Sequence, residues 1–223
     1  MEFKDKVVLI TGAGRGTGSL VAEAFAEQGA SLALNDVSPM NVDILAANLR
    51  AHGANVKVFV EDVAKKVGVQ ALVKQAEDTF GRIDILINHA SVEPHVPLLD
   101  MDEWDWHRVL DVNLTGVFLM MQTAGRIMRA NGGGVIINVA SLSEGTITLD
   151  RSAYIAGLYG MVGLTRQASR ELFAHNIRVH AVGRGLGRFQ NTATTIPADL
   201  SRAVLFLCSP RAAHLTGNIV NLP

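Results

Sequence analysis

Short apolar runs alternate with longer stretches of helical periodicity along the whole chain. The runs typical of strands are 7–10, 31–34, 56–60, 83–87, 134–139, 177–182 and 218–222. Helical spacing of apolar residues lies between them, including one long helix from about Asp102 to Arg129. Continuously apolar strands separated by helices are typical of a parallel sheet covered on both faces. The pattern predicts an α/β fold in which residues 1–223 form a single doubly wound domain, a parallel seven-stranded sheet with helices on both faces.

The composition is that of a folded chain with no strongly charged surface. Of the 223 residues, 48% are hydrophobic and 18% are charged, which excludes an intrinsically disordered protein. The net charge of -1 favours neither nucleic acid nor an anionic membrane as a partner. Cys208 is the only cysteine, and no apolar run has the length of a membrane span. We therefore expect a cytoplasmic protein.

The first apolar run leads directly into a glycine-rich segment, Thr11 to Gly18, and then into a helix. Glycines let the backbone turn sharply and approach a pyrophosphate, and the helix N-terminus supplies free N–H groups and a positive dipole end. Strand, glycine turn and helix together are the setting in which this motif binds a dinucleotide, although a glycine-rich surface turn is the alternative. The cofactor-binding residues expected here are Gly12, Arg15, Gly16, Thr17 and Gly18.

Asp36 closes the second apolar run, eighteen positions after Gly18. This is near the spacing of an acidic residue that binds the ribose 2′-hydroxyl of NAD. A carboxylate there repels the 2′-phosphate of NADP, so NAD is the favoured cofactor. Arg15 could pair with such a phosphate, which leaves NADP open. An ordinary loop acid is the alternative interpretation of Asp36.

Motifs spread over nearly the whole chain resemble the short-chain dehydrogenase/reductase family. Thr11 to Gly18 is similar to the family's TGxxxGxG cradle. Asn88-His89-Ala90-Ser91 stands where the family reads NNAG, and Asp111 to Gly116 is similar to its DVNLxG. The resemblance implies a Rossmann-type domain with strand order 3-2-1-4-5-6-7, and it extends in particular to the 3-oxoacyl carrier-protein reductase branch.

The resemblance also implies roles for individual residues. Ser141 lies thirteen residues before Tyr154, as the catalytic Ser and Tyr do in the family, and Asn113 takes the position of the Asn that joins them. Tyr154 would give or take the hydroxyl proton while hydride is transferred, and Ser141 would hold the carbonyl oxygen. A strand-end serine and an ordinary helix tyrosine are the alternatives. Further cofactor-binding residues implied by the family are Asp62, Val63, Asn88 and Ala90.

One departure from the family falls within the catalytic motif. The family has Lys four residues after its Tyr, and this chain has Leu158. Residues four apart share one face of a helix. An ammonium ~6 Å from the phenol, at an effective dielectric constant of ~20, favours the phenolate by roughly 3 kcal/mol. Leu158 lacks that charge and adds desolvation. We expect oxidation, which needs the phenolate, to suffer most, and slow reduction to persist.

A second group of departures follows the sixth strand. The family's NAVxPG reads His180 to Gly185 here, with Arg184 in place of Pro. The family then carries a substrate-binding segment, whereas this chain continues at once with Gly185-Leu186-Gly187-Arg188. A lid excludes water and completes a site, so its absence after Gly185 predicts an open pocket. No spacing typical of metal ligands is found among the histidines, and we expect no metal site.

Two functions fit these features. The first is an NAD(P)-dependent oxidoreductase of the short-chain dehydrogenase/reductase type, acting on a small carbonyl or alcohol and catalytically impaired. The second is a non-catalytic dinucleotide-binding or assembly protein of the same fold, a pseudoenzyme. Two long helices pair across a two-fold axis in this family, so the resemblance also implies a homodimer or homotetramer.

Overall fold

The computed structural model describes residues 1–139, 149–184 and 197–222. Its strands are β1 (Val7–Thr11), β2 (Ser31–Asp36), β3 (Val56–Val60), β4 (Ile85–Asn88), β5 (Gly134–Val139), β6 (Ile177–Arg184) and β7 (Ile219–Leu222). They form one sheet in the order β3-β2-β1-β4-β5-β6-β7, and all neighbouring strands are parallel. The fold class and strand order expected from the sequence are confirmed.

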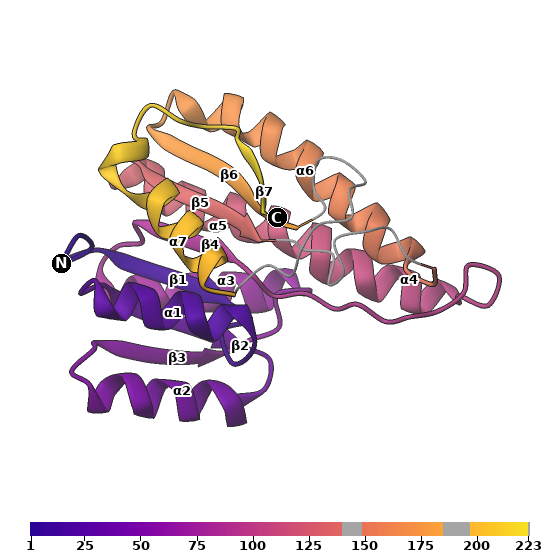
Figure 1. The fold of residues 1–223 in the computed structure, drawn as a ribbon, viewed down its shortest axis with the longest axis horizontal. Helices are drawn as coiled ribbons and strands as arrows, with labels where there is room; N and C mark the ends of the chain where they lie inside the picture. The colour runs from indigo at the N-terminus through magenta and orange to yellow at the C-terminus, as the bar shows by residue number, and fades with distance from the viewer. Residues whose placement is uncertain (140–148, 185–196, 223) are drawn as a thin grey trace.

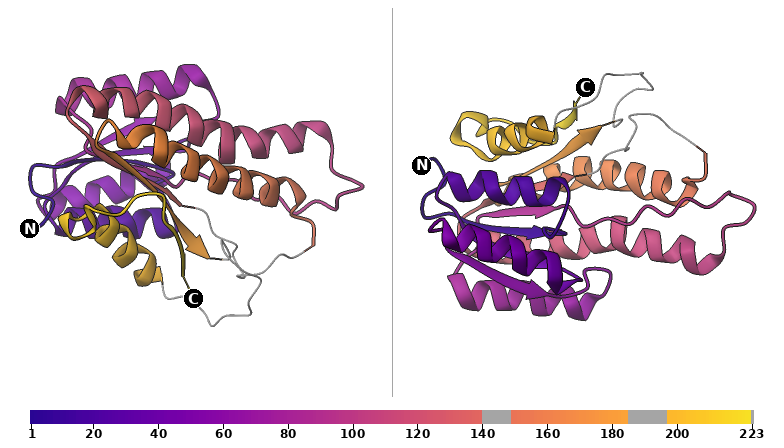
Figure 2. Two further views of the ribbon diagram at one scale, coloured as in Figure 1. Left: turned by 90° about the horizontal axis from the view of Figure 1, so that it is seen from above. Right: turned by 60° about the horizontal axis from the view of Figure 1, so that its bottom comes forward.

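Helices cover both faces of this sheet. They are α1 (Thr17–Glu27), α2 (Pro39–Ala51), α3 (Lys66–Phe80), α4 (Glu103–Leu110), α5 (Val117–Ala130), α6 (Ser152–Phe173) and α7 (Pro197–Cys208), with a short 3-10 helix, η2 (Pro210–Ala212). Helices α1, α2 and α7 lie on one face and α3, α5 and α6 on the other (Figures 1 and 2). Each layer encloses its own apolar core, one containing Phe25 and Leu34 and the other Leu72 and Met120. This explains why the strands are apolar on both sides.

The long helix expected from about Asp102 to Arg129 forms, but it is not regular. Helices α4 and α5 are joined by a π-helical segment, η1 (Asp111–Gly116), which contains Asn113. Such π segments are often found at functional sites. Gly116 packs closely here, because a Cβ atom on it would lie 2.8 Å from the Val63 carbonyl oxygen. The segment thus brings the middle of the helix against the loop after β3.

Polar residues end the central strands. Thr11 on β1 pairs in register with Asn88 on β4, and Asn88 with Asn138 on β5. Asn88 Nδ2 donates to Asn138 Oδ1 at 2.8 Å, and Asn138 Nδ2 donates to Thr165 Oγ1 at 2.9 Å. The strand order reverses direction between β1 and β4, which is where ligands bind in open α/β sheets. The fold therefore predicts a site at these carboxyl ends.

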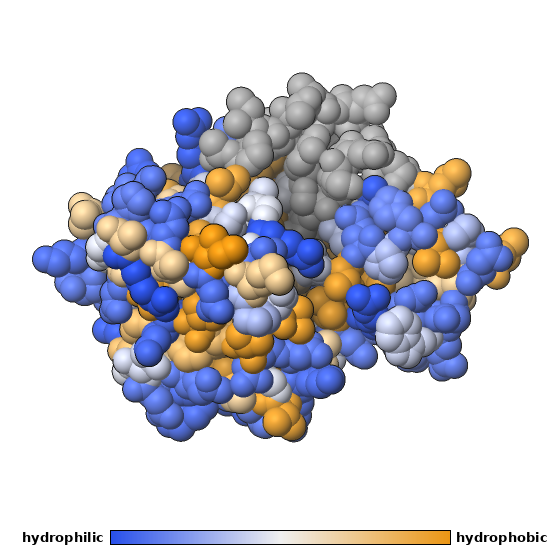
Figure 3. Space-filling view, turned by 90° about the horizontal axis from the view of Figure 1, so that it is seen from below, coloured by the Kyte–Doolittle hydropathy of each residue, from blue (hydrophilic) through white to orange (hydrophobic). Residues whose placement is uncertain are grey.

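On the face seen from below, the described residues form neither a large apolar patch nor a large hydrophilic one. Figure 3 shows hydrophilic residues interrupted by several apolar groups, and a hollow between a larger and a smaller part of the molecule. Within the described ranges, every helix is too short or too polar to span a lipid bilayer.

Candidate functional site

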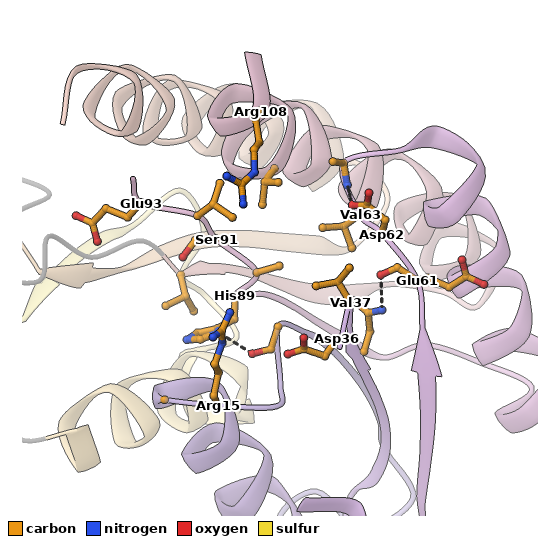
Figure 4. Close-up of a pocket in the computed structure, with 18 of the residues that line it drawn as sticks. Arg15, Asp36, Val37, Glu61, Asp62, Val63, His89, Ser91, Glu93 and Arg108 are labelled. Carbon is orange, nitrogen blue, oxygen red and sulfur yellow. Dashed lines mark hydrogen bonds between the residues drawn. The ribbon is translucent and has the colours of Figure 1, made fainter. Parts of the chain in front are cut away.

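A cavity of about 520 Å³ lies at the carboxyl ends of β1, β2 and β4. Figure 4 shows side chains from the glycine-rich segment, the ends of the strands and α4 around it. Nine of the residues that the sequence indicated line the cavity: Gly12, Arg15, Gly16, Thr17, Asp36, Asp62, Val63, Ala90 and Tyr154. The described structure thus brings together residues from five separate segments of the chain.

The glycine-rich segment has the backbone of a phosphate cradle. Gly12 and Gly16 have φ angles of 63° and 62°, which favour glycine. A Cβ atom on Gly12 would lie 2.7 Å from the Ala90 Cα, and one on Gly18 would lie 2.5 Å from the Gly12 carbonyl oxygen. Helix α1 begins at Thr17 with no side-chain cap and no acidic residue in its first turn. Its first N–H groups and positive dipole end are therefore available to an anion, which fits the pyrophosphate of a dinucleotide.

Asp36 joins the cradle to the end of β2. Its Oδ2 accepts from the Gly14 N–H and its Oδ1 from the Ser38 N–H, both at 3.0 Å. These bonds hold the carboxylate at the wall of the cavity while each oxygen keeps a further lone pair. On the neighbouring wall, Asp62 Oδ1 accepts from the Ala64 N–H at 3.0 Å. Carboxylates at this end suit hydroxyl donors and repel a phosphate.

His89 contacts the cradle from the loop after β4, and sequence reasoning gave it no role. Its Nδ1 lies 3.1 Å from the Gly12 carbonyl oxygen, and its Nε2 lies 2.8 Å from Thr17 Oγ1. Burial lowers the pKa of His89, and the Gly12 carbonyl and the Asp36 carboxylate oppose this only in part. The signal that could have found it is its place in the family's NNAG position, where Asn is usual.

Tyr154 and Leu158 share a much smaller cavity beside the large one. This second cavity, of about 20 Å³, is also lined by Asn113 and Met161. Tyr154 is 5% exposed and Leu158 is 3% exposed. No lysine lines either cavity in the described part of the chain. The position where the family has an ammonium is therefore a buried apolar side chain.

Asn113 belongs to this small cavity, but its amide is used elsewhere. Its Nδ2 donates to the Val92 carbonyl oxygen at 2.8 Å, and its Oδ1 accepts from the Val92 N–H at 2.9 Å. Among the other expected residues, Asn88 lies behind the large cavity and bonds Asn138, and Gly18 packs under Gly12. Ser141 lies outside the described residues, as do Gly185 and the segment after it.

The loop after β4 is also fastened to the start of α6. Arg151 Nη1 lies 2.9 Å from Glu93 Oε1, in an ion pair whose guanidinium side chain is 3% exposed. The Val96 N–H donates to the Asp150 carbonyl oxygen at 2.8 Å. Because Glu93 lines the large cavity, these contacts couple its wall to the helix that carries Tyr154. No cluster of three metal-ligating side chains occurs in the residues described.

Comparison with known proteins decides the family. The model of the short chain dehydrogenase family matches residues 6–199. The chain belongs to the short-chain dehydrogenase family. Members of this family are oxidoreductases that bind NAD or NADP.

Two curated relatives and one solved structure illustrate the similarity. D-threitol dehydrogenase from Mycolicibacterium smegmatis is 34% identical over 232 residues, covering 95% of this chain and 89% of the relative. A 3-oxoacyl-[acyl-carrier-protein] reductase from Thermotoga maritima is 30% identical over 245 residues, covering 100% of this chain and 98% of the relative. A short chain dehydrogenase from Mycobacterium smegmatis superposes with a TM-score of 0.90 at 32% identity, covering 100% of this chain and 93% of the other.

Proposed function

We propose that this short-chain dehydrogenase binds NAD in preference to NADP and is a catalytically impaired oxidoreductase for a small carbonyl or alcohol. The cradle and the N-terminus of α1 support binding of the pyrophosphate. Asp36, fixed by two backbone N–H groups, supports binding of a ribose hydroxyl and rejection of a 2′-phosphate. Asp62, Val63 and Ala90, which line the same cavity, would complete the dinucleotide site.

A bound nicotinamide dinucleotide supplies the hydride in reduction and accepts it in oxidation. The residues of this chain would transfer the proton of the substrate's hydroxyl group. Tyr154, at the edge of both cavities, is the proton donor in reduction, and Ser141 would orient the carbonyl oxygen. Asn113 would act by holding the backbone of Val92, which lines the large cavity together with Tyr154.

The observation that carries the proposed impairment is Leu158 beside Tyr154. Both residues are buried and line one small cavity, and none of the described residues that line this cavity is cationic. Leu158 supplies no ammonium to stabilise a phenolate, and burial disfavours the phenolate. Tyr154 can then still donate a proton to a developing alkoxide. It is a poor base for oxidising an alcohol.

The length of the alignments supports an abbreviated substrate segment. The Thermotoga reductase aligns over 245 positions, although this chain has 223 residues, so the relative carries residues that have no counterpart here. We propose that part of this difference follows Gly185, where the family's substrate segment begins. A site with less cover admits more water and selects substrates less strictly.

A non-catalytic dinucleotide-binding role is the second candidate, and the same Leu158 favours it. In this role the protein would bind the dinucleotide without turnover and would associate with further copies of itself. Helices α5 and α6 border a groove of about 410 Å³ with Phe118, Met121 and Leu164 in its lining. Pairing of this groove across a two-fold axis would give a homodimer or homotetramer. Sedimentation velocity measures that state directly.

The function is tested by binding and turnover on the same protein. NADH and NADPH are titrated against the unmodified protein by fluorescence, and reduction of a panel of small ketones is then measured. Leu158→Lys is compared with Leu158→Met, a matched change that adds no charge, and each is repeated with Tyr154→Phe. We expect NADH to bind, the unmodified protein to be slow, and Leu158→Lys to gain tenfold or more in a Tyr154-dependent way, since proton transfer contributes ~10²–10⁴.

Three other outcomes of these titrations and rate measurements would contradict part or all of the proposed function. Turnover by the unmodified protein at about 10 s⁻¹, an ordinary enzyme rate, would show that the site is not impaired. Binding without reduction, even by Leu158→Lys, would leave the non-catalytic role. Absence of binding at millimolar NADH would remove both.

A further inference from the structure

His89 connects two ends of the phosphate cradle that are far from it in sequence. One ring nitrogen meets the Gly12 carbonyl at the end of β1, and the other meets the Thr17 hydroxyl at the start of α1. Both Thr17 and His89 line the large cavity. The ring also lies against Gly18, where a Cβ atom would be 2.7 Å from Nδ1. The imidazole is thus built into the cradle itself.

The hydrogen bonds determine which form of His89 this arrangement holds. A carbonyl oxygen only accepts, so Nδ1 must carry a proton toward Gly12. In the neutral ring Nε2 has a lone pair, and the Thr17 hydroxyl donates its proton to it. In the protonated ring Nε2 donates to Thr17 Oγ1 instead, and both contacts survive. The hydroxyl proton of Thr17 then becomes free for an anionic oxygen in the cradle.

Burial opposes protonation of His89 in the free protein, and an anion beside the ring would favour protonation. Burial lowers the pKa of His89, whereas the Gly12 carbonyl and the Asp36 carboxylate raise it in part. The positive end of α1 adds to the effect of burial. Figure 4 shows Arg15 and Asp36 on the same side of the cavity as His89, with charges of opposite sign. The charged residues on the other walls are Glu61, Asp62, Glu93 and Arg108. A pyrophosphate in the cradle would add two negative charges next to the ring.

We propose that His89 is a proton-linked positioning residue of the cradle, which takes up a proton from solvent when a dinucleotide pyrophosphate binds. The imidazolium then donates through both nitrogens, and Thr17 turns its hydroxyl proton to the phosphate. This rests on the proposed dinucleotide binding. It adds that binding tightens as the pH falls, because the bound state holds more protons, up to one per site, than the free state.

Calorimetric titration with ADP-ribose tests the proton uptake without any turnover. At pH 6.5, the binding enthalpy is measured in buffers of different ionisation enthalpy, and the slope gives the protons taken up per site. We expect a clear uptake for the unmodified protein and none for His89→Asn. His52→Asn, an exposed histidine at the end of α2, is the matched control and should keep the uptake. The dissociation constant should rise between about threefold and tenfold from pH 6 to pH 8 if binding raises the His89 pKa by about one unit or slightly more.

Direct titration of the His89 ring by NMR covers the case in which His89→Asn does not fold. We expect the pKa of His89 to be higher in the protein saturated with ADP-ribose than in the free protein. Binding of ADP-ribose with no proton uptake and no change in the His89 pKa would overturn this inference and leave the dinucleotide site standing. Failure of ADP-ribose, NADH and NADPH to bind at any pH would overturn the proposed function and this inference together.

Discussion

Asn113 and Val92 are joined by two hydrogen bonds: the Asn113 Nδ2 donates to the Val92 carbonyl oxygen at 2.8 Å, and the Asn113 Oδ1 accepts from the Val92 N–H at 2.9 Å. Asn113 lies in the π-helical segment η1, and Val92 lies in the loop after β4. The pair therefore fixes the loop that lines both cavities against the irregular part of the long helix. It gives Asn113 a positioning task that needs both of its polar atoms.

Replacement of Asn113 by Ala should lower the free energy of unfolding by about 2 kcal/mol, since each of two part-buried hydrogen bonds contributes about 1 kcal/mol. Urea denaturation measures this change. Asn131→Ala, at an exposed position after α5, is the control and should change stability by less than about 0.5 kcal/mol. Equal stability of Asn113→Ala and the unmodified protein would show that the Val92 pair adds nothing.

Replacement of Asp36 by Asn should narrow the preference for NADH over NADPH. The change removes the negative charge that faces a 2′-phosphate, so the ratio of the two dissociation constants should fall about tenfold, for ~1.4 kcal/mol of lost repulsion. Fluorescence titrations measure the dissociation constants of NADH and NADPH. A general distortion of the cradle would raise both constants alike, so their ratio reports the charge effect alone. Glu61→Gln removes another acid of the same cavity and should alter the ratio much less. A ratio unchanged in Asp36→Asn would contradict the assignment of Asp36.

Replacement of Gly18 by Ala should weaken dinucleotide binding at least about fivefold, because overpacking of a tight contact costs about 1–3 kcal/mol. The added methyl group would meet the Gly12 carbonyl oxygen and the His89 ring. Gly163→Ala is the matched control, since a Cβ atom on Gly163 in α6 would meet nothing within 4 Å. Alanine is the better helix residue by up to about 1 kcal/mol, so the control should keep or raise the melting temperature. Equal NADH affinity in both variants would show that the cradle tolerates a side chain at Gly18.

Acid should destabilise the protein through His180 on β6. This side chain is fully buried, and burial together with the Arg178 charge lowers its pKa to about 4. The Leu215 backbone opposes this slightly, yet neither ring nitrogen makes a well-aligned hydrogen bond to the described residues. The unfolded chain binds the proton below about pH 6.5, so the stability lost between that pH and pH 4 is roughly 3 kcal/mol.

Urea denaturation across this pH range tests the effect. His180→Leu should flatten the loss of stability by removing the titrating group, whereas His214→Asn, an exposed histidine, should keep the slope. An unchanged slope in His180→Leu would assign the acid sensitivity to other groups.

Local spacing carried most of what could be predicted from the sequence. The apolar run before Asp36 predicts a strand that ends at this residue, and the structure ends β2 there. The spacing of four residues predicts Leu158 on the same helix face as Tyr154, and in the structure both line one small cavity. Such relationships span only a few residues along the chain, so a pattern captures them.

The contacts that could not be predicted join distant segments through individual atoms. The His89 bond to Thr17 spans 72 positions and depends on ring orientation, which no periodicity encodes. The π-helical segment has the apolar spacing of an ordinary helix, so the sequence predicts a regular one. Similarity to a motif indicated a catalytic position for Asn113 but not that its amide bonds the Val92 backbone.

The ion pair between Glu93 and Arg151 also restricts how this protein can be re-engineered. Its two members come from different segments, and the Arg151 guanidinium has almost no access to water. Replacement of only the loop after β4 would leave the buried Arg151 guanidinium without its carboxylate. Such an unpaired buried charge lowers the free energy of unfolding by about 3–5 kcal/mol. Segments exchanged with a relative must therefore be taken in pairs, the loop together with the first turn of α6. The loop after β4 and the start of α6 therefore constrain each other's sequence through this one buried contact.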